Sequence, residues 1–235
     1  MLKSTPDEIR RRFDADVERF SNLETGQSAT MDAPVSLELV AGAAAVVCPG
    51  AESLLDIGCG AGNYTLKLME VLPLRRVTLM DLSRPMLERA EQRIRAAGSC
   101  AIEAIQADIR EADFPGGSFD VAVAAATLHH LRGEEEWSAV FGAIWRWLKP
   151  GGSLWISDLV EHRPAALHRM MWDRYGAYLT ALKGPDYREH VFAYIHREDT
   201  PRPLAWQLDR LREAGFGEVE VLHKNTCFAA FGAVK

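Results

Sequence analysis

The sequence has few cysteines and no close cysteine pair. Its four cysteines in 235 residues, Cys48, Cys59, Cys100 and Cys227, lie far apart, and none belongs to a Cys-x-x-Cys motif. This spacing argues against a disulfide framework and favours buried thiols in a reducing compartment. No apolar run approaches the length of a membrane span, and the first residues lack the apolar core of a secretion signal. We therefore expect a cytoplasmic protein with no membrane partner.

Basic residues do not outnumber acidic ones. The formal net charge of −6 weighs against a broad nucleic-acid surface, because such surfaces cluster Lys and Arg. No internal repeat or low-complexity tract is present. Four histidines of the second half lack a recognised ligand spacing, so we expect no metal there. They are His162, His168, His190 and His196.

The amino-terminal pattern predicts helices before the main fold. Residues Thr5 to Glu8 form a capping-box pattern with Pro6 at the first helical position. Apolar residues then recur at helical spacing up to Phe20, which predicts one amphipathic helix. The polar stretch 21–34 is expected to be a loop, and 35–47 a second, apolar helix. We assign 1–35 to a helix with a lid loop, and 36–235 to the main domain.

From residue 53 onward, strand-like and helical patterns alternate. Strand-like runs cover 53–58, 76–81, 101–108, 119–126 and 152–160, separated by helical patterns over 62–72, 83–98 and 134–148. This alternation implies an α/β fold whose parallel sheet has helices on both faces. After a helix over 204–216, two strand-like runs follow each other so closely that they must be antiparallel. The segment 161–200 interrupts the alternation with a helix that Pro164 opens.

A glycine-rich turn follows the first strand. The stretch LLDIGCGAGNYT, residues 54–65, has the spacing Gly-x-Gly-x-Gly behind Asp56. Asp81 ends the second strand and Asp108 follows the third. Because the carboxyl ends of parallel strands share one edge of the sheet, these residues and 125–130 should meet.

These residue types favour a ligand without phosphate. A dinucleotide site prefers Gly-x-Gly-x-x-Gly, and Asp56 would repel a diphosphate but could hold an ammonium group. Asp81 can accept from both ribose hydroxyls, and Asp108 from an adenine amino group. Ribose, adenine and ammonium together fit S-adenosylmethionine.

Five successive motifs carry a family resemblance: LLDIGCGAGNYT, LMDLS, QADIRE, FDVAVAAATLHHL and LKPGGSLWISD. They resemble those of class I S-adenosylmethionine-dependent methyltransferases over residues 36–160, and 203–235 is similar in outline. The resemblance implies a Rossmann-like three-layer sandwich with a mostly parallel seven-stranded sheet, an antiparallel terminal strand, N-terminal helices and an inserted helical lid. It implies cofactor contacts by Asp56, Gly58, Cys59, Gly60, Asp81, Leu82, Asp108, Ile109 and Ala125.

Candidate acceptor residues lie near the expected methyl group. His130 is the predicted catalytic residue, because an imidazole can orient or deprotonate an acceptor. The alternative is that one histidine packs and the other bonds the backbone. His129, Trp172 and Tyr175 are predicted to contact the substrate, the last two from an aromatic lid at 161–200. The sequence lacks the Asn/Asp-Pro-Pro-aromatic and Pro-Cys motifs of base-methylating enzymes, which favours a small-molecule substrate over nucleic acid.

Three questions stay open at the level of sequence. The pattern FDADVERF is also similar to carboxy-S-adenosylmethionine synthases, although the following loop lacks their tyrosine. A non-catalytic cofactor-binding subunit is the other alternative, and the intact turn and acids argue against it. Trp145, Trp147 and Trp155 either cover the core or support a homodimer.

Overall fold

The amino-terminal segment folds as two helices rather than one. The computed structural model describes residues 3–22 and 27–235, so the predicted loop 21–34 lies partly outside the described residues. Helix α1 (Pro6–Asp14) begins at the predicted capping box, in which Thr5 and Glu8 exchange hydrogen bonds. It ends at Asp14, and α2 (Val17–Ser21) follows after a turn. The prediction of one helix reaching Phe20 is therefore wrong.

The break between α1 and α2 has tertiary causes. The Asp14 carboxylate accepts a hydrogen bond from Ser83 Oγ at 2.6 Å, which holds the end of α1 against α6. The turn also folds Phe20 back, so that its ring centroid lies 5.5 Å from that of Phe13. In a continuous helix, residues seven apart would be separated by about 10 Å along the axis.

The sheet has the predicted topology. Its seven strands run in the order β3-β2-β1-β4-β5-β7-β6, and all neighbours are parallel except β7, which is antiparallel to β5 and β6. The strands are β1 (Ser53–Ile57), β2 (Arg76–Asp81), β3 (Ala101–Gln106), β4 (Phe119–Ala125), β5 (Leu148–Leu159), β6 (Glu218–Asn225) and β7 (Phe228–Val234). The carboxyl ends of β1 to β5 therefore share one edge.

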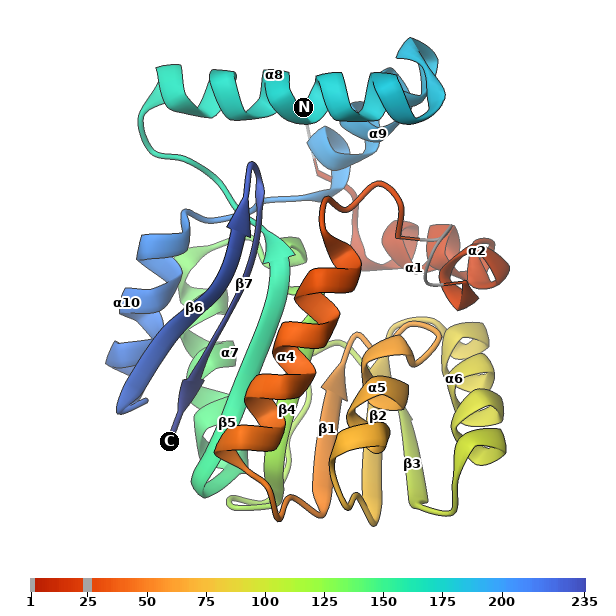
Figure 1. Cartoon of the computed structure of the whole chain (residues 1–235), viewed down its shortest axis with the longest axis vertical. Coiled ribbons are helices and arrows are strands. Elements are labelled where there is room, and N and C mark those ends of the chain that lie inside the picture. The colour runs from red at the N-terminus through yellow and green to blue at the C-terminus, as the bar shows by residue number, and fades with distance from the viewer. Residues whose placement is uncertain (1–2, 23–26) are drawn as a thin grey trace.

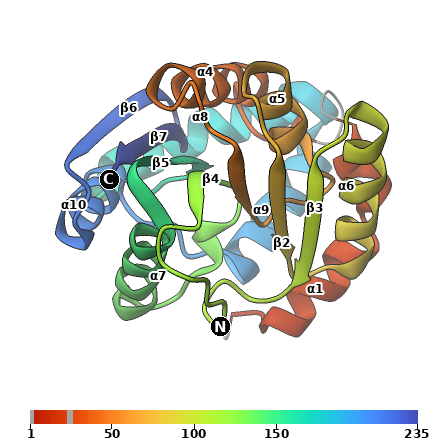
Figure 2. The same ribbon diagram turned by 90° about the horizontal axis from the view of Figure 1, so that it is seen from below.

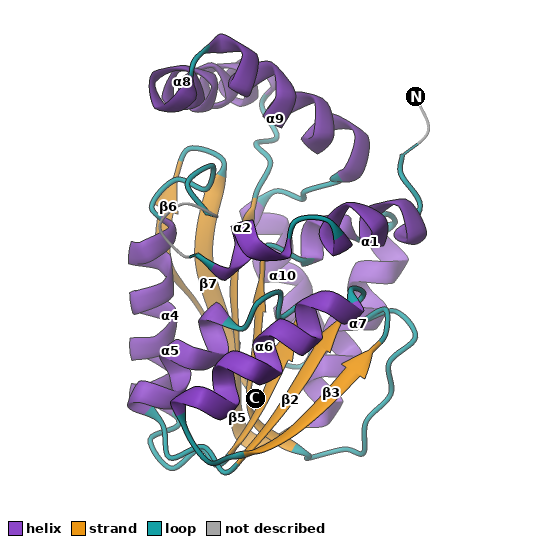
Figure 3. Cartoon of the chain, turned by 90° about the vertical axis from the view of Figure 1, so that its right-hand side faces the viewer, coloured by secondary structure: helices purple, strands orange, loops and turns teal. Residues whose placement is uncertain are grey.

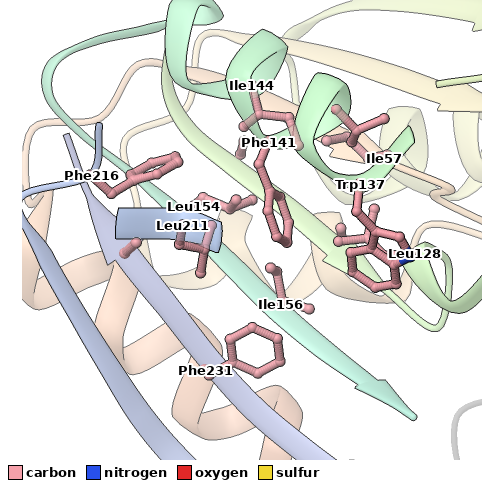
Figure 4. Close-up of a cluster of buried hydrophobic side chains, with 14 of the residues drawn as sticks. Ile57, Leu128, Trp137, Phe141, Ile144, Leu154, Ile156, Leu211, Phe216 and Phe231 are labelled. Carbon is pink, nitrogen blue, oxygen red and sulfur yellow. The ribbon is translucent and has the colours of Figure 1, made fainter. Parts of the chain in front are cut away.

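Helices cover both faces of the sheet (Figures 1 and 2). One face carries α4 (Ala33–Val47), α5 (Asn63–Val71) and α6 (Arg84–Ala97), and the other carries α7 (Glu134–Trp147) and α10 (Leu204–Ala214). Figure 4 shows Trp137 and Phe141 of α7 packed toward Ile156 and Phe231 of the sheet. Residues 107–118, all described, form turns rather than a helix. The three-layer arrangement is thus confirmed.

The insertion is a helical hairpin above the carboxyl edge. Pro164 precedes α8 (Ala165–Lys183), and α9 (Pro185–Glu198) follows Gly184 directly. Figures 1 and 3 show this hairpin beyond the strand tips, with α1 and α2 beside it. The hairpin packs Tyr175 and Leu179 against Leu159 and Phe228 at the ends of β5 and β7. The edge of the sheet is therefore covered by two segments far apart in sequence.

Two of the three tryptophans that could either cover the core or support a homodimer lie in the core. Trp147 and Trp155 are buried within the chain, at 1% and 3% exposure. Trp145 is half-buried and packs beside Lys235 and Gly215. None of the helices in the described residues is long and apolar enough to cross a membrane.

Candidate active site

The glycine turn brings backbone amides to the sheet edge. Gly58, Gly60 and Gly62 have φ values of +65°, +50° and +81°, a region that residues with a Cβ seldom adopt. The amides of Gly58 and Cys59 donate to the Met80 carbonyl of β2 at 2.7 and 3.1 Å. The turn is thereby fixed against the neighbouring strand.

Two acids flank this turn, the buried Asp56 and the half-buried Asp81. Asp81 accepts hydrogen bonds from the amides of Gly60 and Ser83, each at 2.8 Å, and Asp56 accepts one from Thr65 Oγ1 at 2.6 Å. Burial raises the pKa of Asp56 to about 7 and that of Asp81 to about 6, although these hydrogen bonds oppose the rise. Both acids would therefore gain from a cationic or hydrogen-bond-donating ligand.

The predicted cofactor residues surround two adjoining cavities. We call the first the turn cavity; the predicted residues lining it are Asp56, Gly58, Cys59, Gly60, Asp81, Leu82 and Ala125. The second, the edge cavity, is lined by Asp108 and Ile109 and shares Gly58, Asp81 and Leu82 with the first. The structure thus brings all the predicted cofactor residues together. That each contacts a cofactor stays a prediction.

Asp108 already has a partner. Arg110 donates to it through Nε at 2.8 Å and also through Nη2. Burial disfavours the charge of Asp108, but these bonds keep the pKa of its carboxyl below the usual value. An adenine amino group would have to share this carboxylate with Arg110.

His129 is held between two buried carboxylates. Its Nδ1 bonds to Asp158 at the end of β5, and its Nε2 lies 3.6 Å from Asp199 Oδ1, just after α9. Burial alone would lower its pKa, but Asp158 and Asp199 raise it to about 9. His129 is therefore protonated at neutral pH.

His130 has the opposite protonation state from His129. Burial and the neighbouring His129 charge lower its pKa below the usual value, so its ring is neutral. Its Nδ1 lies 3.3 Å from Asp199 Oδ1, and neither ring nitrogen has a hydrogen-bond partner among the described residues. His130 lines the turn cavity, the edge cavity and a third cavity under the hairpin.

That third cavity, the lid cavity, is the candidate acceptor site. Aromatic rings from four parts of the chain line it together with His129 and His130: Phe13, Phe20, Tyr64, Tyr175, Tyr194 and Phe228. Of the predicted substrate residues, Tyr175 contributes its ring, because its hydroxyl donates to the Ala29 carbonyl at 3.0 Å. Trp172 does not line any of the three cavities. It lies beside His168 at a separate outer pocket.

Sequence reasoning missed Asp158 and Asp199. Asp158 follows a predicted strand, so the rule that singled out Asp81 could have found it. Asp199 gave no such signal, because it lies near the end of the insertion 161–200, directly after α9, and not at the end of a predicted strand. His129, His130 and Asp199 each offer an atom within 4.8 Å of the others, an arrangement that a metal ion could accept.

The comparisons with known proteins agree with this geometry. Residues 54–152 match a family model described as a methyltransferase domain. The family model, relatives and structural neighbours together support a class I S-adenosylmethionine-dependent methyltransferase. The predicted family and its cofactor, S-adenosylmethionine, are thereby confirmed.

Two curated methyltransferases and one solved structure illustrate the likeness. The chain is 29% identical to malonyl-acyl-carrier-protein O-methyltransferase of Paenibacillus sp. JDR-2, over 71% of this chain and 55% of that protein. It is 32% identical to 27-O-demethylrifamycin SV methyltransferase of Amycolatopsis mediterranei, over 71% of this chain and 64% of that protein. The 1,6-didemethyltoxoflavin-N1-methyltransferase of Burkholderia thailandensis superposes with a TM-score of 0.65 at 17% identity, covering 100% of this chain and 92% of that one. The chain thus spans between half and two thirds of the length of these two curated relatives.

The pKa values of Asp56 and Asp81 predict how the affinity of the chain for S-adenosylmethionine changes with pH. Both carboxyls are largely protonated at pH 5.5 and ionised at pH 8, since their pKa values are about 6 and 7. The ionised forms attract the cationic cofactor and accept its hydroxyls, so affinity should rise with pH. We expect a gain of about tenfold or more between these pH values, measured by isothermal titration calorimetry. Equal affinities at both pH values would contradict the assignment.

A substitution at Asp81 tests its predicted ribose contact. Asp81→Asn keeps one acceptor oxygen for the turn amides but removes the charge. We expect S-adenosylmethionine affinity to fall about 10-fold to 100-fold, as for loss of a charge-assisted hydrogen bond. Asp113→Asn, on the exposed connection between β3 and β4, is the control and should leave the affinity unchanged. Unchanged binding by Asp81→Asn would mean that the ligand lies elsewhere.

Proposed function

We propose that this chain transfers a methyl group from S-adenosylmethionine to a small acceptor in the lid cavity, with His130 as the general base. The cofactor supplies a methyl group activated by its sulfonium. The acceptor atom forms the new bond to carbon, the carbon–sulfur bond breaks, and its electron pair stays on sulfur. The chain's main contribution is to hold the two reactants in line, which can supply several kcal/mol.

The position and state of His130 carry this proposal. Its neutral ring lies where the turn cavity meets the lid cavity, and neither of its nitrogens has a hydrogen-bond partner within residues 3–22 and 27–235. It can therefore accept the proton that an acceptor hydroxyl or amine loses. His129 is already protonated and cannot take this role.

The lid cavity favours a planar, largely apolar acceptor. Its wall is more apolar than polar and includes six phenylalanine and tyrosine rings, and the two arginines at it are engaged elsewhere. Arg12 forms an ion pair with Glu198 at 2.7 Å, and Arg19 with Asp16 at 2.6 Å. A carboxylated cofactor would need a free cation here, so no observation favours a carboxy-S-adenosylmethionine synthase.

The experiment incubates the full chain and S-adenosylmethionine with each of three acceptors, 1-naphthol, 2-naphthylamine and transfer RNA. Mass spectrometry then measures the S-adenosylhomocysteine that each reaction releases. We expect turnover with a naphthalene acceptor and none with the RNA. Methylation of the RNA alone would overturn the small-molecule proposal. Binding of S-adenosylmethionine without turnover of any acceptor would favour a non-catalytic binding subunit.

The remaining assignments are proposals that the same preparation can address. We propose a cytoplasmic location, no nucleic-acid partner, and the division into residues 1–35 and 36–235. Helix α4 begins at Ala33, just ahead of that boundary. A homodimer is also proposed, and sedimentation equilibrium would detect it.

A further inference from the structure

Asp199 is a carboxylate that lies close to both histidines. Its Oδ1 lies 3.6 Å from His129 Nε2 and 3.3 Å from His130 Nδ1, and its side chain is 4% exposed. Neither Asp199 Oδ1 nor any nitrogen of His130 has another hydrogen-bond partner among the described residues. Leaving buried polar atoms unpaired is costly, so these atoms are expected to interact with each other or with a ligand.

The chain holds the backbone of Asp199 from several directions. The Asp199 amide donates to the Ile195 carbonyl of α9 at 2.8 Å, and Lys3 Nζ donates to the Asp199 carbonyl at 2.5 Å. The next residue, Thr200, donates from its amide to the His129 carbonyl at 2.7 Å. The carboxylate is thus fixed relative to the turn that carries the histidines.

Arg132 extends this anchor to the amino-terminal segment. Its guanidinium donates to Thr200 Oγ1 at 3.0 Å, to the Ser4 carbonyl at 2.9 Å and to the Glu198 carbonyl. The end of the lid, the histidine turn and the start of the chain therefore meet at one side chain.

The two histidines differ in their need for Asp199. His129 has a carboxylate partner in Asp158, which also accepts from the Leu128 and His129 amides at 2.9 and 3.2 Å. In the part of the chain that the structure describes, Asp199 is the carboxylate that forms an ion pair with His130. A role for Asp199 as counter-ion to His129 alone would leave both nitrogens of His130 unexplained.

We propose that Asp199 is a positioning residue for His130. It accepts the Nδ1 proton of His130, which fixes the tautomer in which Nε2 carries the free lone pair. That lone pair is what a general base needs, so the inference rests on the proposed function. Asp199 itself keeps its charge throughout, and the acceptor proton ends on His130 Nε2.

The tautomer of the His130 ring can be determined by NMR in the absence of cofactor and acceptor. In the full chain labelled with ¹⁵N-histidine, long-range ¹H–¹⁵N correlation spectra distinguish Nδ1–H from Nε2–H rings. We expect the Nδ1–H form of His130 in the wild type. In Asp199→Asn the side-chain amide can donate to Nδ1, so the ring should change to the Nε2–H form. The charged and titratable groups around this ring are His129, Asp158, Asp199 and Asp108, and the spectra are recorded at fixed pH.

Two matched variants separate positioning from loss of structure. Asp158→Asn alters the partner of His129 and should move the His129 signals while His130 keeps its tautomer. Asp173→Asn, on the exposed face of α8, should change no histidine signal of the pair. A His130 tautomer that is the same in wild type and Asp199→Asn would overturn the proposal.

Turnover and metal binding provide the remaining outcomes. With 1-naphthol as the probe, Asp199→Asn should lower kcat at least 100-fold and change the S-adenosylmethionine Kd less than twofold. Unchanged kcat would overturn the positioning role. Stoichiometric binding of added Zn²⁺ that shifts both histidines and is lost in Asp199→Asn would also overturn it, since Asp199 would then be a metal ligand. Because the tautomer is read in the free chain, absence of methyl transfer would contradict only the proposed function.

Discussion

His130→Gln should lower kcat for methylation of 1-naphthol about 10² to 10⁴-fold while S-adenosylmethionine affinity changes less than twofold. Glutamine keeps a polar side chain of similar reach but cannot accept a proton at neutral pH. The predicted cofactor contacts lie on the turn and the strand ends, so their geometry should survive. Stopped assays that quantify S-adenosylhomocysteine give kcat, and calorimetry gives the affinity.

A more acidic acceptor sharpens this prediction. At pH 8 a mononitrophenol is largely ionised and needs no base, so His130→Gln should affect its methylation far less than that of 1-naphthol. His190→Gln, on the exposed face of α9, is the matched control and should behave as wild type. An equal loss with both acceptors would show that His130 orients the acceptor without accepting its proton.

The histidine pair has a division of charge that the surrounding acids enforce. Asp158 and Asp199 stabilise one proton on His129, and that charge in turn disfavours a second proton on His130. A buried neutral imidazole beside a cation is poised to take a proton only when the acceptor releases one close by. The two histidines are thus expected to differ in protonation state although they are neighbours in sequence.

The cofactor side of the site could be predicted because topology alone assembles it. Parallel strands place their carboxyl ends on one edge, so Asp56, Asp81 and Asp108 had to meet whatever their detailed contacts. The family motifs then supplied the intervening residues. The same rule would have found Asp158 if it had been applied to the fifth strand.

The acceptor side could not be predicted in the same way. Asp199 reaches the site because α8 and α9 form a hairpin that returns the chain to the histidine turn, and no local pattern encodes that return. Periodicity placed Tyr175 on the apolar face of α8, but it could not show that Trp172, one turn earlier, lies at the outer pocket. The break after Asp14 likewise depends on Ser83, a residue of another element.

Gly58→Ala should destabilise the fold more than any other single change in the glycine turn. A Cβ at residue 58 would lie 2.1 Å from Thr127 Oγ1 and 2.9 Å from Thr127 Cβ, and φ is +65°. The clash includes a Cβ and cannot be relieved by a side-chain rotation alone, so the turn must move away from β4. We expect a loss of about 3 kcal/mol or more in the free energy of unfolding, measured by urea denaturation.

Gly60→Ala is the matched control, because it separates backbone strain from the clash. Its φ is +50°, but a Cβ there would meet no heavy atom within 4 Å. Only the conformational cost of about 1 to 2 kcal/mol should remain. Adding Thr127→Ala to Gly58→Ala removes the two closest atoms and should recover part of the lost stability. Equal destabilisation by the two glycine substitutions, with no recovery in the double variant, would mean that the conformation of the turn, rather than its approach to Thr127, requires glycine at position 58.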